Sequence, residues 1–87
     1  MKIKYPLLYV EWDDHHSYEG WVPEDKVINT PSACISVGWL YMEDDKGITL
    51  ISSMGDEGQV SCTHYIIKSC ITKRVVVRKG QIEKTKQ

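Results

Sequence analysis

Several features common in enzymes and membrane proteins are missing from this 87-residue sequence. It has no phenylalanine, and no apolar run approaches the ~20 residues that a membrane-spanning helix needs. It also has no G-x-S-x-G nucleophile motif and no P-loop. We therefore expect no catalytic residues, no cofactor and no enzymatic activity.

No cysteine pair has the close spacing of the common cysteine-based sites. The three residues, Cys34, Cys62 and Cys70, form no close C-x2-C pair of the kind that binds structural zinc. An odd number of cysteines also argues against a disulfide framework. We predict that they are small, buried apolar residues. The N-terminus has no long apolar segment typical of a signal peptide, which predicts a cytoplasmic protein.

The stretch from Ser32 to Leu50 organises the remaining chain. Residues 33–42 are almost all apolar or β-favouring, residues 43–47 are polar, and the β pattern resumes at 48–51. This order predicts a hairpin of two antiparallel strands. Gly38 inside the first strand predicts a strong bend or a close backbone approach. Gly47 is suited to a positive φ in the turn.

The same alternation predicts three further strands, over residues 5–12, 59–67 and 71–78, with a very short break at 68–70. Pro23 favours at most one short helical turn near residues 23–28. No long helical period is present, so the predicted fold class is all-β, either a sandwich or a small barrel. We expect a single domain over residues 1–79 and a polar C-terminal tail over 80–87.

Charge is distributed unevenly along the chain. Residues 1–67 carry four basic side chains against eleven acidic ones, whereas residues 68–87 carry seven basic side chains against Glu83 alone. Such asymmetry is typical of a surface that binds phosphate groups, and equally of a solvated tail that pairs with an acidic front. Both interpretations remain open at this stage.

Two segments carry a resemblance to a known family. Val37-Gly38-Trp39-Leu40, followed by Asp44 and by Ile48-Thr49-Leu50, resembles the first signature of the Sm-like family, which includes the Sm proteins and the RNA chaperone Hfq. Gly47 stands where that family has Asn. Lys68-Ser69-Cys70-Ile71 resembles the second signature, with Ser69 in place of His.

The order of parts is also similar to small Sm-like proteins of bacteriophages. The matching residues are Trp12-Asp13-Asp14, Gly20-Trp21 and the segment 36–40. The resemblance implies a strongly bent, five-stranded, SH3-like barrel. It also implies a homo-oligomeric ring, in which the fourth strand of one subunit pairs with the fifth strand of the next. The apolar run Val75–Val77 suits such an edge.

The resemblance further implies binding of single-stranded RNA or a small nucleotide through the loops at the two signatures. A lysine attracts phosphate, and a tyrosine ring stacks on a base. The replacement of the family's Asn and His leaves uridine recognition of the usual kind open. The candidate ligand-binding residues are Lys68, Ser69, Tyr65, His64, Asp44 and Gly47.

Other interpretations of the same residues stay open. Lys68-Ser69 also suits a solvated turn, and the segment from Asp13 to His16 suits a solvated loop more than a metal site. The acidic front, comprising Glu11, Asp13, Asp14 and Glu19, suits docking onto a host protein in the host cytoplasm. Sequestration of a nucleotide signal used in antiviral defence is a further possibility. We expect two of the three tryptophans, Trp12, Trp21 and Trp39, in the core.

Overall fold

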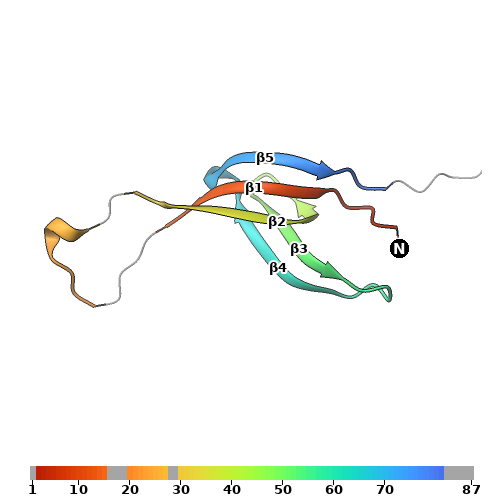
Figure 1. Cartoon of the computed structure of the whole chain (residues 1–87), viewed down its shortest axis with the longest axis horizontal. Coiled ribbons are helices and arrows are strands. Elements are labelled where there is room, and N and C mark those ends of the chain that lie inside the picture. Colours follow the sequence, from red (N-terminus) through yellow and green to blue (C-terminus); the bar gives the residue numbers. More distant parts are fainter. Residues whose placement is uncertain (1, 16–19, 28–29, 82–87) are drawn as a thin grey trace, which may run out of the picture.

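The protein forms one five-stranded antiparallel sheet with the strand order β4-β3-β2-β1-β5 (Figure 1). The computed structural model describes residues 2–15, 20–27 and 30–81. The strands are β1 (Leu7–Asp14), β2 (Ser32–Glu43), β3 (Gly47–Met54), β4 (Val60–Ile67) and β5 (Ile71–Arg78). The all-β prediction is confirmed. The sheet is not closed into a barrel, because its edge strands β4 and β5 do not pair with each other.

The strands lie where the alternation of the sequence predicts them, with differences at some ends. Strand β1 begins at Leu7 instead of residue 5, and β3 continues to Met54, beyond the expected end at residue 51. Asp13 and Asp14, expected in a loop, continue β1 because they pair with Ala33 and Ser32 at the start of β2. The break after β4 is a helical turn, η2 (Lys68–Cys70), in addition to the expected turn η1 (Glu24–Lys26). The prediction of at most one helical turn was therefore wrong. None of the described helices is long and apolar enough to cross a membrane.

Strand β2 bends the sheet because its two halves pair with different neighbouring strands. Its first part pairs with β1, and its last part pairs with β3. The register with β3 shifts between Leu40 and Met42, which is a bulge that increases the bend. Gly38 is buried, and a Cβ built on it would lie 3.0 Å from both the carbonyl oxygen of Ile51 and the Cβ of Leu50. The predicted close approach at Gly38 is confirmed.

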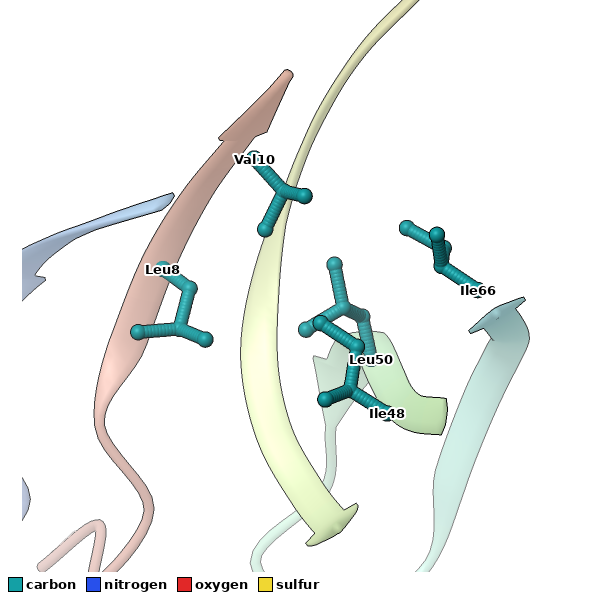
Figure 2. Packing of buried hydrophobic residues seen from close by; sticks show 5 residues of the cluster. All are labelled: Leu8, Val10, Ile48, Leu50 and Ile66. Carbon is teal, nitrogen blue, oxygen red and sulfur yellow. The ribbon is translucent and has the colours of Figure 1, made fainter. Parts of the chain in front are cut away.

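The core lies on the concave face that this bend creates. Leu8 and Val10 of β1 face Ile48 and Leu50 of β3 and Ile66 of β4, and each of these side chains is at most 3% exposed (Figure 2). Strands β1 and β4 are not neighbours in the sheet, so only the bend brings them into one apolar cluster.

An arm projects from this body along the longest axis of the molecule (Figure 1). We define the arm as residues 13–32, of which 16–19 and 28–29 lie outside the described residues, including His16 and Glu19. The arm carries η1 near its tip. Trp21 is fully exposed, whereas Trp12 and Trp39 are half-buried in the sheet. The radius of gyration is 17.4 Å, against about 12 Å expected for a compact chain of this length.

The cysteines are less buried than expected. Cys34 and Cys70 are half-buried, and Cys62 on β4 is exposed; all three are free thiols. Cys62 also has a φ of 57°, a left-handed conformation that is uncommon for a residue other than glycine. The prediction of buried apolar cysteines was wrong for Cys62, because β4 is an edge strand and only its inward-facing residues meet the core.

The chain beyond β5 returns to the N-terminal segment. Gln81 donates its backbone N–H to the carbonyl of Ile3 at 2.7 Å and accepts from the Ile3 N–H through its side chain at 3.2 Å. Residues 82–87 of the expected tail lie outside the described residues.

Candidate functional site

The turn between β2 and β3 is held by Asp44. Its Oδ1 accepts hydrogen bonds from the backbone N–H groups of Lys46 (2.9 Å) and Gly47 (2.8 Å), while its own N–H donates to the Gly47 carbonyl at 3.0 Å. These bonds, first that from Gly47, hold the pKa of Asp44 below its usual value. The Asp44 carboxylate is therefore a built-in part of the turn.

Gly47 is required by packing rather than by its backbone angle. Its φ is not positive, contrary to the expectation from turn chemistry. A Cβ built on Gly47 would instead overlap the ring of Tyr65 and approach the carbonyl of Ile66 to 2.8 Å. The Tyr65 ring thus lies directly over Gly47, leaving the Tyr65 residue 51% exposed.

Tyr65 also interacts with Asp44. Partial desolvation of the hydroxyl, followed by the negative charge of Asp44 and a hydrogen bond to it, raises the pKa of Tyr65. The Tyr65 hydroxyl is therefore neutral at physiological pH, so the ring offers an uncharged face for stacking.

Lys68 joins the two signature loops. Its backbone N–H donates to the carbonyl of Lys46 at 2.8 Å, which ties η2 to the β2–β3 turn. Its Nζ lies 2.8 Å from Oε2 of Glu43. The loops that the sequence marks separately, around residues 44 and 68, therefore form one continuous surface.

Glu43 has a second cationic partner, Arg74 of β5. The guanidinium group donates two hydrogen bonds to the carboxylate, at 3.0 and 3.1 Å. The bonds from Arg74, and next from Lys68, lower the pKa of Glu43 to about 2. Sequence analysis missed both Glu43 and Arg74 as site residues. No local pattern signals this contact, since the two residues are 31 positions apart and meet only through the bend.

The remaining two predicted residues, Ser69 and His64, lie in different places relative to the site. Ser69 is exposed within η2, next to Lys68. His64 is not part of the site. Its neighbour Tyr65 points to the opposite face of the strand, and the His64 ring lies edge-on to Trp12 of β1, with 5.2 Å between ring centroids. His64 and Trp12 thus contact each other across the concave face.

The candidate site therefore consists of Asp44, Gly47, Tyr65, Lys68 and Ser69, supported by Glu43 and Arg74. Within the described ranges, no group of three or more His, Cys, Asp or Glu side chains is arranged to hold a metal ion. No protein-family model matches this chain, and no curated protein or solved structure gives a significant match. The functional argument accordingly depends on the geometry of the site and of the sheet.

Proposed function

We propose that this protein is a non-enzymatic, ring-forming binding module of the Sm-like type, and that it binds single-stranded RNA or a small nucleotide. The observation that carries the proposal is the half-exposed ring of Tyr65 over Gly47, at the junction where the backbone of Lys68 joins η2 to the β2–β3 turn. A neutral aromatic face next to a cation is the minimal set of groups that recognises a base and its phosphate.

The ion-pair geometry supports a role for Lys68 in phosphate binding. Arg74 alone engages both carboxylate oxygens of Glu43, so Lys68 can turn to a phosphate without leaving that carboxylate unpaired. The Lys68 side chain is 37% exposed, which gives a ligand access to it. Arg74 still balances the negative charge of Glu43 when Lys68 turns to the phosphate.

The two sheet edges support assembly of several copies. In the described part of the chain, β4 pairs only with β3, and β5 pairs only with β1. Each strand therefore offers one unpaired backbone edge, and natural sheets rarely leave such edges uncovered. Exposed apolar residues accompany both edges, among them Val60 and Ile67 on β4 and Val75 and Val77 on β5. Pairing of β4 with β5 of the next copy would cover them and repeat the ligand site around the assembly.

Fluorescence anisotropy with a labelled oligouridylate and a labelled oligoadenylate tests ligand binding. We expect binding at 50 mM salt that weakens steeply by 300 mM, as phosphate contacts require. Tyr65→Leu removes the stacking face and should weaken binding about 5- to 150-fold, the equivalent of about 1–3 kcal/mol. Tyr65→Phe is the matched control, because it keeps the ring and should bind almost as well as the unchanged protein.

A charge control separates Lys68 from general electrostatic attraction. Lys68→Met should weaken binding and flatten its salt dependence. Lys26→Met removes the same charge from η1, in the arm. It should leave the affinity and its salt dependence nearly unchanged. Thermal-shift measurements with mononucleotides and cyclic dinucleotides distinguish a small nucleotide signal from RNA. Absence of binding to every oligonucleotide and nucleotide at 50 mM salt would refute the proposed ligand class.

Light scattering tests the assembly separately. We expect a mass several times that of one chain. The double variant Val75→Lys/Val77→Lys places like charges along the β5 edge, and it should lower that mass. If the protein without substitutions is a monomer at 100 µM, the proposed ring is contradicted.

A further inference from the structure

The two ends of the molecule differ in chemistry, and the arm forms one of them. The principal extents are 68 × 24 × 21 Å, and the tip of the arm lies at the opposite end of the long axis from the N-terminus (Figure 1). Near the tip, Trp21 is 102% exposed and Val27 is 55% exposed. The adjoining charged residues Glu24 and Asp25 are acidic, with Lys26 as the only described cation of the arm.

At the other end, the N-terminal segment and the β3–β4 hairpin enclose an open cleft of about 730 Å³. Its apolar lining includes Ile3, Met54 and Val60. The rings of Tyr5 and Tyr41 also line it, inclined to each other with 5.3 Å between their centroids. Such a cleft is large and aromatic enough to receive an indole ring.

The charges around the cleft complement those of the arm tip. Lys2 and Lys4 line it. Arg78 and Lys79 lie close by, because Gly80 packs against the backbone of Lys4. Asp56 of the hairpin is the acidic residue of the lining, and the exposed Glu57 follows it in the chain. The exposed cations therefore outnumber the acids at this end, whereas the acids outnumber the cation at the tip of the arm.

We propose that the arm of one copy docks into the cleft of a second copy, with Trp21 inserted between the apolar residues and Tyr5 and with Glu24 and Asp25 facing Lys2 and Lys4. The occupant is a separate molecule, because the tip and the cleft of one chain lie at opposite ends of the long axis. The contact is head-to-tail, so it propagates from copy to copy and closes into a ring or continues as a filament. It does not involve the nucleotide site, and it shares Val60 with the proposed pairing edge of β4.

Photo-cross-linking tests this contact in the full chain. Benzoylphenylalanine replaces Trp21 in a variant of natural ¹⁴N content. This variant is mixed with the ¹⁵N-labelled protein that carries no substitution. We expect mixed-isotope cross-links to peptides containing residues 2–5 or 54–60. Cross-links confined to the arm, or to other surfaces, would overturn the proposal. The absence of cross-links between copies, with capture of a foreign protein instead, would overturn it equally.

Sedimentation equilibrium of substituted proteins provides a second test. In the Val75→Lys/Val77→Lys background, which removes the proposed pairing of β4 with β5, Trp21→Ser should weaken the remaining self-association about tenfold or more, as expected for a buried aromatic anchor. Ile35→Ser is the matched control, because Ile35 is an exposed apolar residue of β2 outside the arm (63% exposed), and it should have little effect.

Lys2→Glu/Lys4→Glu and Glu24→Lys/Asp25→Lys should each weaken self-association, while a mixture of the two variants should associate. Failure of the mixture to associate, with both variants folded by circular dichroism, would contradict the proposed pairing of charges. Retention of association by Trp21→Ser would contradict the role of the indole.

Discussion

The body and the arm of this molecule differ in how far their side chains are buried. In the body, defined as the described residues outside 13–32, the bend of β2 brings β1 and β4 together and buries Leu8, Ile48 and Ile66 almost completely. In the arm, none of the described residues is buried, and Trp21 is as exposed as in an isolated peptide. The two regions are nevertheless continuous, because β1 and β2 run through both.

This contrast separates residues that serve the fold from residues that serve contacts outside it. Body side chains are fixed by packing and by ion pairs within the chain. The described residues do not bury Trp21, although burial of its large ring would be favourable. Substitutions in the two regions should therefore differ in kind: stability should change in the body, and association should change in the arm.

The largest loss of stability is expected in the core. Ile48→Ala removes a side chain that is fully buried between β1 and β4, and it should reduce the free energy of unfolding by about 2–5 kcal/mol. Urea denaturation followed by circular dichroism measures this change. A loss below 1 kcal/mol would mean that the concave face does not form the principal core.

Gly47→Ala should have the next largest effect, because the added methyl group overlaps the Tyr65 ring and the Ile66 carbonyl. We expect a loss of about 1–3 kcal/mol in the same assay, together with displacement of Tyr65. Gly20→Ala provides the comparison in the arm. It meets no atom within 4 Å, so only the strain of its φ of 82° contributes to any loss.

Glu43 gives the stability of the body a dependence on pH. Its pKa is lowered to about 2 by Arg74 and then Lys68, so its ion pairs stabilise the fold above about pH 4.5 and lose that effect as the pH falls towards 2. Because the carboxylate is partly exposed, solvent screening limits the contribution to about 1 kcal/mol or less.

Thermal unfolding between pH 7 and pH 2.5 measures this contribution. Glu43→Gln should remove part of the pH dependence, whereas Glu24→Gln in η1 should leave it unchanged. An identical pH profile for both variants would show that the ion pairs of Glu43 do not affect stability.

The smallest effect on stability is expected for Trp21→Ser. The indole is fully exposed, so the free energy of unfolding of the dilute protein should stay within about 0.5 kcal/mol of its original value. Denaturation at a concentration where only single chains are present measures it. A larger loss would show that Trp21 contacts its own chain and would remove the distinction between body and arm.

Local patterning was sufficient to predict the strands. The alternation in residues 71–78 predicted β5 with its observed ends, and the apolar stretch 33–42 predicted β2 to within one residue at each end. The resemblance assigned ligand binding to the loops around Asp44 and Lys68, and that assignment stays a prediction. The contact between these loops, through the Lys68 N–H and the Lys46 carbonyl, is a finding of the structure.

Long-range features were beyond sequence reasoning. The contact between Glu43 and Arg74, and that between His64 and Trp12, depend on how far the sheet bends, and no local spacing encodes that angle. The continuation of β1 through Asp13 and Asp14 was missed because polar residues resemble a loop unless their partner strand is known. The expectation that two of the three tryptophans lie in the core did not identify Trp21 as the exposed one, because composition does not tell which of several rings packs against the core.

The free thiol of Cys62 offers a direct way to observe whether the β4 edge is occupied. It is exposed on an edge strand of the single chain, held in a left-handed backbone conformation. An alkylating reagent therefore reaches it readily in separated chains, and a neighbouring strand laid along β4 would slow that reaction. The same exposure makes oxidative cross-linking a hazard during purification, so the protein should be handled with a reductant before any measurement of its assembly.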